Sequence, residues 1–219
     1  MKKIKYPDPT QWSSLCQRPS IDTMTLENKI KSIFLEVKID KDAALYKMSE
    51  QFDGVKPDAI AFDLSSKTFE IDPELAAAIQ TAKANIEMFH RPQETPVQKI
   101  ETTEGVTCWR KSVAIQSVGL YIPGGSAPLF STLLMLAIPA KIAGCKNIVV
   151  CTPPDNKGEL NEVIGWTCKL LGIQKIHLIG GAQAIAAMTY GTPSVPKVDK
   201  PTPICENEFE IWNTNKTWK

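Results

Sequence analysis

The chain has 219 residues, and its 25 Lys and Arg residues against 24 Asp and Glu residues give a formal net charge of +1. This near balance argues against binding to nucleic acid or to an acidic membrane surface, because both require a strong positive field. The longest apolar stretch, residues 133–140, is far shorter than the ~20 residues that span a bilayer. Composition therefore predicts a soluble globular protein with neither a nucleic-acid nor a membrane partner.

The amino terminus and the cysteines indicate a cytoplasmic protein. The basic start of the chain is interrupted by Pro7, Asp8 and Pro9 before an apolar segment forms, so it does not have the pattern of an export signal. The six cysteines include no C-x-x-C pair, and several lie in apolar runs, where a free thiol behaves as a small hydrophobic group. We therefore expect reduced cysteines and no cysteine metal site.

The first half of the chain is expected to be mainly helical. Apolar residues recur at helical spacing across residues 26–37, and a second helix is predicted to end at Asp53 and Gly54. An N-cap Asp followed by Pro predicts a third helix, which runs to about His90. Residues 93–117 then alternate apolar and polar side chains, which predicts a small sheet beside these helices.

The following segment repeats a strand-turn-helix unit. Apolar runs alternate with segments of helical period, which is typical of parallel strands joined by right-handed crossovers. The predicted elements are strand 113–121, helix 127–143, strand 147–151, helix 159–171, strand 175–179 and helix 182–190. The predicted fold class is α/β: a Rossmann-like parallel sheet layer with helices, preceded by a mainly helical N-terminal region with a small sheet.

Two turns in this repeat bear on ligand binding. The turn Pro123-Gly124-Gly125-Ser126 precedes a helix, and its glycines allow a phosphate to approach the backbone. It does not match G-x-G-x-x-G, so a tight turn without a ligand is the alternative interpretation. The second strand lacks the usual acidic residue for a nucleotide ribose, because Asp155 comes only after two prolines. A dinucleotide bound here would therefore be held differently from that in typical Rossmann enzymes.

A series of sequence runs in this repeat resembles one known family. The runs are VGLYIPGG, STLLMLAIPAKIAGC, CTPP, GGAQAIAA, YGT and SVPKVDK. Their order and sequence are similar to those of the histidinol dehydrogenases, and weaker similarity begins near residue 15. That family is about twice this length, and the resemblance stops at Pro201, where a Gly-Pro-Gly-Asn segment is expected. The resemblance thus implies an N-terminal half, truncated or frameshifted after about residue 200.

The resemblance also implies an activity and a cofactor site. Histidinol dehydrogenases are zinc-containing homodimers that use NAD to oxidise L-histidinol through L-histidinaldehyde to L-histidine in histidine biosynthesis. Their NAD site is lined by a tyrosine and a glutamine that fall on Tyr121 and Gln183. Both follow the carboxyl ends of predicted parallel strands, where open α/β sheets bind ligands, so we expect them to lie close together and to be partly exposed. A core tyrosine and a solvent-facing glutamine are the alternative interpretations.

No catalytic or metal-binding residue is predicted in this chain. The resemblance implies that zinc is bound by Gln, His and Asp side chains and that a Glu-His pair acts as acid and base, all from the second half of the family's sequence. The two histidines present here, His90 and His177, are expected to be structural, because one ends a helix and the other lies inside a strand. We therefore expect the chain alone to be inactive and to bind no zinc.

Three regions and two alternative functions complete the prediction. The regions are an N-terminal helical or α+β region at 1–117, an incomplete Rossmann-like NAD-binding domain at 118–200, and an aberrant, disordered tail at 201–219, which has no sustained period. One alternative is an inactive fragment or interaction module that retains only the fold. The other is an oxidoreductase related to the aldehyde dehydrogenases, which would need a catalytic cysteine in an accessible turn.

Overall fold

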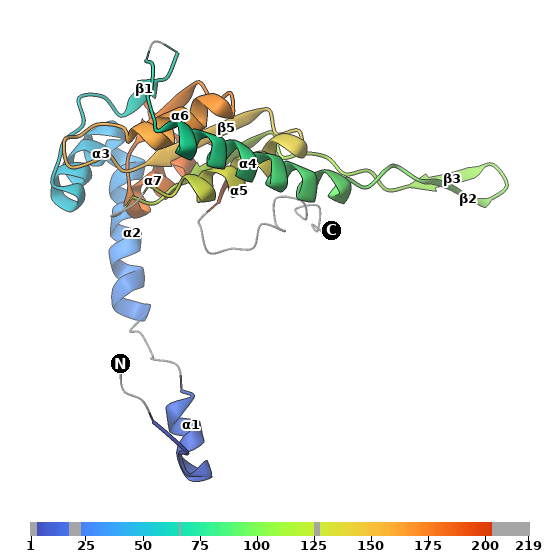
Figure 1. Ribbon diagram of the computed structural model, residues 1–219, viewed down its shortest axis with the longest axis horizontal. Helices are drawn as coiled ribbons and strands as arrows, with labels where there is room; N and C mark the ends of the chain where they lie inside the picture. The colour runs from blue at the N-terminus through green and yellow to red at the C-terminus, as the bar shows by residue number, and fades with distance from the viewer. Residues whose placement is uncertain (1–3, 18–22, 66, 125–127, 203–219) are drawn as a thin grey trace.

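The computed structural model describes residues 4–17, 23–65, 67–124 and 128–202. It shows a five-stranded sheet with helices on both faces and a separate two-stranded hairpin (Figure 1). The strands are β1 (Ala61–Asp63), β2 (Lys99–Thr103), β3 (Val106–Trp109), β4 (Ser117–Tyr121), β5 (Asn147–Thr152), β6 (Lys175–Leu178) and β7 (Lys200–Thr202). The helices are α1 (Trp12–Leu15), α2 (Thr23–Asp40), α3 (Asp42–Met48), α4 (Pro73–His90), α5 (Phe130–Ile142), α6 (Glu162–Leu170) and α7 (Gly181–Tyr190), with short segments η1 (Pro9–Gln11), η2 (Ser49–Asp53) and η3 (Arg91–Gln93).

The five-stranded sheet has the order β1-β6-β5-β4-β7. Strands β4, β5 and β6 are parallel neighbours, so the predicted α/β fold with a parallel sheet is confirmed. Two edge strands were not predicted: β1 pairs antiparallel with β6, and β7 pairs parallel with β4. Since β7 includes Pro201 and Thr202, the sheet continues two residues into the predicted tail, and residues 203–219 lie outside the described residues.

Successive residues of the central strands face opposite layers of helices, as the two-residue period of a strand requires. On β5, Val150 packs into the cluster formed with α4, α5 and α6, whereas Val149 and Cys151 pack into the cluster formed with α2, α3 and α7. Both faces of the sheet are therefore covered, which explains its nearly continuous apolar runs. The boundary predicted between residues 117 and 118 falls inside β4, and the division into regions stays a prediction.

The N-terminal helices form where their local signals place them. The side chain of Asp72 caps α4 by accepting hydrogen bonds from the backbone N–H groups of Glu74 and Leu75, at 2.8 and 3.2 Å. Helix α3 continues through the π-helical turn η2, which ends where Gly54 adopts a left-handed conformation, with φ of 71°. Asp53 is the last residue of η2, directly before this left-handed glycine.

Two segments extend away from the sheet and its helices (Figure 1). Every residue of β2 and β3 is exposed, so the predicted small sheet forms, but it projects from the molecule instead of lying beside the helices. The first half of α2 is also exposed, and Leu26 retains 50% of its accessible surface. Among the helices in the described ranges, none is both long and apolar enough to span a bilayer.

Candidate functional site at the carboxyl edge of the sheet

Strands β4, β5 and β6 end side by side, and Pro153 packs between the turns that follow β4 and β6. A Cβ atom on Gly124 would overlap the Pro153 ring, and a Cβ atom on Gly180 would lie 2.8 Å from Pro153 Cβ. Since real Cβ atoms do not approach so closely, glycine is required at both positions. This contact gives a packing reason why Pro-Gly-Gly, Thr-Pro-Pro and Gly-Gly follow the three strands.

Tyr121 ends β4, is half-buried, and joins that strand to the start of α7. Its hydroxyl accepts a hydrogen bond from the backbone N–H of Gly181 at 2.9 Å. Gly180, the N-cap residue of α7, has no side chain to cap the helix, so this phenol takes that role. Burial raises the pKa of Tyr121, the Gly181 hydrogen bond opposes this shift, and the negative charge of Asp53 adds to it. The phenol is therefore neutral at physiological pH.

Gln183 lies in the first turn of α7 with only 2% of its surface exposed. The expectation that it is partly exposed was wrong, as was the alternative of a solvent-facing glutamine. Its side chain folds back over Gly181, where a Cβ atom would lie 2.6 Å from Gln183 Oε1 and where φ is 62°. Within the described part of the chain, Gln183 Nε2 is buried and has no hydrogen-bond partner. A buried N–H donor without a partner is uncommon and calls for an explanation.

The structure brings Tyr121 and Gln183 together at Gly181, the first bound to its N–H group and the second covering its Cα atom. The turn residues Gly125 and Ser126, predicted to approach a phosphate, lie outside the described residues. Gly124 lies beside Pro153, as described above.

Asp53 is a third polar residue at this edge, and it was not identified from the sequence as a site residue. Its Oδ1 atom would lie 3.3 Å from a Cβ atom on Gly180. Its Oδ2 atom is buried without a hydrogen-bond partner in the described residues, and burial raises the pKa of the carboxyl group. The sequence showed Asp53 only as part of a helix stop, because its contact with Gly180 joins segments far apart in the chain.

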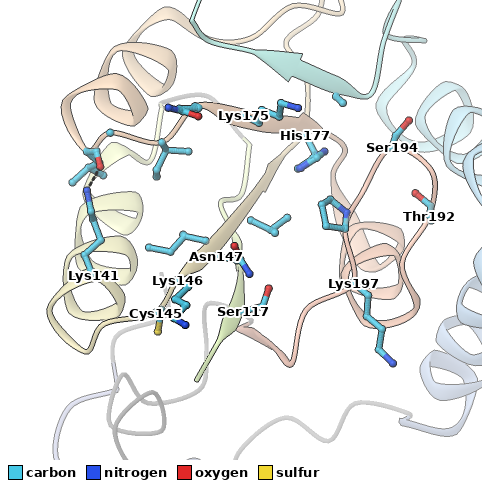
Figure 2. A pocket seen from close by; sticks show the side chains of 18 of the residues that line it. Ser117, Lys141, Cys145, Lys146, Asn147, Lys175, His177, Thr192, Ser194 and Lys197 are labelled. Carbon is cyan, nitrogen blue, oxygen red and sulfur yellow. Dashed lines mark hydrogen bonds between the residues drawn. The ribbon is translucent and has the colours of Figure 1, made fainter. Parts of the chain in front are cut away.

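The opposite, amino edge of the sheet has a cavity of about 910 Å³ (Figure 2). Its lining includes Lys141, Lys146, Lys175 and Lys197, and Figure 2 shows these side chains spread around it. The Lys141 ammonium group already donates to the backbone carbonyl of Leu171. The other three lysine side chains belong to exposed residues, so this edge presents dispersed, solvated charges.

The two histidines lie away from the carboxyl edge. His177 lines the amino-edge cavity with 4% of its surface exposed, and burial lowers its pKa to about 4, with the charge of Lys175 adding to this shift and the Ser194 backbone opposing it. His90 is buried at the end of α4, with Nδ1 3.2 Å from Gln93 Oε1. The Nδ1 atom of His177 is also buried without a hydrogen-bond partner in the described residues. The structural role expected for both histidines stays a prediction.

Candidate metal ligands do not cluster in the described part of the chain. Within these residues, no group of three or more His, Cys, Asp or Glu side chains is close enough to hold a metal ion. A zinc site requires about four such ligands around one point. The described residues therefore do not fit zinc.

A mostly parallel sheet between two layers of helices, with its glycine-bearing turns at the carboxyl edge, defines an α/β protein of the Rossmann-like class. Comparison with known families then identifies the particular one. The family model for histidinol dehydrogenase matches residues 16–202, and the chain belongs to this family. The family assignment sets aside the aldehyde dehydrogenase alternative.

Individual relatives agree with this assignment. The chain is 50% identical over 203 residues to a histidinol dehydrogenase of Bacteroides fragilis strain YCH46, covering 91% of this chain and 47% of the relative. It is 44% identical over 195 residues to that of Aliivibrio fischeri, covering 87% and 44%. The crystal structure of histidinol dehydrogenase from Elizabethkingia anophelis superposes with a TM-score of 0.82 at 46% identity, covering 90% of this chain and 46% of that one. The chain thus spans about half the length of the relatives it matches.

Proposed function

We propose that this chain is the NAD-binding part of a histidinol dehydrogenase and that NAD binds at the carboxyl edge of the sheet, against Tyr121 and Gln183. The complete enzyme would oxidise L-histidinol through L-histidinaldehyde to L-histidine. When bound, NAD supplies the hydride acceptor for both oxidations. The observation that carries the proposal is the buried, unpartnered Nε2 atom of Gln183, because a ligand oxygen at this edge would satisfy it.

The other residues of this edge also suit a dinucleotide. The N-cap residue of α7, Gly180, has no side chain, and Tyr121 accepts only the Gly181 N–H group, so the helix dipole at this start favours a negatively charged group such as a pyrophosphate. Gly180 and Gly181 let the Asp53 and Gln183 side chains lie directly against the backbone at the start of α7. Tyr121 holds the first turn of α7 against β4, which fixes the position of Gln183 relative to the strand ends. The chain's own residues would therefore bind and orient the cofactor.

Zinc, a homodimer and a cytoplasmic location are proposed for the complete enzyme, on the basis of the family alone. The described residues do not fit zinc, as shown above, so we derive no chemical step from the metal. Proton transfer from the histidinol hydroxyl requires a base, and we assign that role to no residue of this chain.

An equilibrium titration with NAD tests the proposal. The 219-residue chain should bind NAD, and Gln183→Ala should weaken binding about tenfold, the effect of losing roughly one buried hydrogen bond. Gln174→Ala is the matched control, since Gln174 is an exposed glutamine that lines the amino-edge cavity. Equal NAD affinities of the Gln183→Ala and Gln174→Ala variants would contradict the proposed site.

A further inference from the structure

We infer that Asp53 is a further cofactor-binding residue. One neutral group of NAD would donate a hydrogen bond to the Asp53 carboxylate and accept a hydrogen bond from the Gln183 side-chain amide. The inference rests on the proposed function, because it places a third side chain in the same site. Asp53 belongs to η2, on the N-terminal side of the chain, and reaches the turn between β6 and α7. Asp53 lies outside the six runs of the strand-turn-helix repeat and outside the parallel strands, although it belongs to the FDGV run of the weaker N-terminal resemblance.

The first step is the complementarity between two unpartnered groups. Asp53 Oδ2 is a buried acceptor, Gln183 Nε2 is a buried donor, and neither has a hydrogen-bond partner in the described residues. Their side chains lie against consecutive residues, Asp53 on Gly180 and Gln183 on Gly181. One unpartnered acceptor and one unpartnered donor therefore belong to side chains that lie against adjacent residues of the turn between β6 and α7. A ligand group that both donates and accepts a hydrogen bond satisfies both atoms.

The second step identifies that ligand group by its chemistry. A ribose hydroxyl, the carboxamide of nicotinamide and the amino edge of adenine each supply a donor and an acceptor, and NAD contains all three. A phosphate offers only acceptors and would be repelled by the Asp53 carboxylate. Strand β5 ends at Thr152 and is followed by Pro153, so it lacks the acidic residue that usually holds a ribose. Asp53 supplies an acidic side chain to this edge from a different element.

The third step separates this role from a structural one. No salt bridge among the described residues involves Asp53, and its Oδ2 atom gains no hydrogen bond on folding. Burial raises the pKa of the carboxyl group, which means that the ionised form is disfavoured in the folded chain. An uncharged side chain of the same shape would therefore fold at least as well. The carboxylate has a use only when a ligand donor meets it.

The test compares Asp53→Asn with the unsubstituted 219-residue chain by calorimetric titration with NAD and by thermal unfolding without ligand. We expect the substitution to weaken NAD binding at least tenfold and to leave the unfolding midpoint unchanged or raised. Glu50→Gln, an exposed carboxylate on the same η2 turn, is the control and should alter neither quantity. Parallel titrations with ADP-ribose and AMP assign the group: a loss confined to NAD indicates the carboxamide, a loss shared by NAD and ADP-ribose but absent with AMP indicates a hydroxyl of the nicotinamide-side ribose, and a loss shared by all three indicates the adenosine portion.

The remaining outcomes overturn the inference in distinguishable ways. Unchanged NAD affinity in Asp53→Asn refutes it and leaves the proposed function intact. A fall in both NAD affinity and the unfolding midpoint shows that Asp53 acts through the fold, which also refutes it. If the unsubstituted chain binds no NAD, the proposed function fails and the inference fails with it.

Discussion

The two edges of the sheet differ in how many of their buried polar groups lack a hydrogen-bond partner. At the carboxyl edge, the Gln183 Nε2 atom and the Asp53 Oδ2 atom are buried without hydrogen-bond partners in the described residues. At the amino edge, a cavity of about 910 Å³ is surrounded by lysines that are solvated or already bonded. The amino edge has more space and one unpartnered buried group, the Nδ1 atom of His177, in the described residues. The carboxyl edge has both an unpartnered donor, Gln183 Nε2, and an unpartnered acceptor, Asp53 Oδ2, in side chains that lie against adjacent glycines. This donor-acceptor pair is our reason for placing the ligand at the carboxyl edge.

The largest expected effect concerns catalysis. With a cofactor site at the carboxyl edge but no assigned catalytic base, the chain should bind NAD without oxidising L-histidinol. The 219-residue chain with L-histidinol, NAD and added zinc should remain at background in a spectrophotometric assay of NADH. The family resemblance implies that the acid-base pair and the zinc ligands belong to the part of the family's sequence that this chain does not match, and hydride transfer needs all groups held together. Turnover within about tenfold of a full-length relative would show that the catalytic groups had been missed.

Acid should destabilise the amino edge through His177. The folded-state pKa of about 4 lies below the ordinary value of 6.5, so neutral His177 contributes stability that is complete above pH 6.5 and is lost as pH falls toward 4. The loss in free energy of unfolding should reach about 3 kcal/mol. Chemical denaturation between pH 7 and 4 measures it, and His177→Gln should have a flatter profile. An identical pH profile in the variant would remove His177 as the cause.

Glycine substitutions at the two edges should differ in their effect on NAD affinity. Gly180→Ala places a Cβ atom 2.8 Å from Pro153 Cβ, so we expect a cost of about 1–3 kcal/mol in unfolding free energy and much weaker NAD binding. Gly172 lines the amino-edge cavity with φ of 67°. Gly172→Ala should therefore lower the free energy of unfolding by about 1 kcal/mol and leave the NAD affinity unchanged. If Gly172→Ala weakens NAD binding as much as Gly180→Ala does, the claim that NAD binds only at the carboxyl edge is wrong.

The smallest expected effect is that of one hydroxyl group. Tyr121→Phe removes the acceptor of the Gly181 N–H group and should cost about 1 kcal/mol in unfolding free energy, with a modest loss of NAD affinity. Tyr190→Phe, at the other end of α7, is the control, because no hydrogen bond of its hydroxyl is seen in the described residues. Similar losses in both variants would show that the Gly181 contact contributes little.

Local sequence signals predicted most of the fold. Helix α4 was predicted from Asp72 and the following proline, and β4 to β6 from apolar runs whose two faces are both buried. Strands β1 and β7 were missed, because each has only three residues and is defined by its neighbour in the sheet. The hairpin β2-β3 has the alternation of a packed strand, yet both its faces are exposed.

The candidate site was predictable only where it coincided with motifs. Tyr121 and Gln183 were found because the family resemblance covers their runs, and the parallel order of the strands brings those runs to one edge. The burial of Gln183 was not predictable, since it depends on how its side chain folds over Gly181. Asp53 was missed because a long-range contact, which has no period in the sequence, brings it to Gly180.

A titration with NAD monitored by backbone amide resonances tests the central claim most directly. The account predicts that the amide signals of Tyr121, Gly181 and Gln183 shift as NAD is added, while those of Asn147 and Gly172 at the amino edge do not. Shifts concentrated at Asn147 and Gly172, or no shifts at millimolar NAD, would contradict a cofactor site at the carboxyl edge of the sheet.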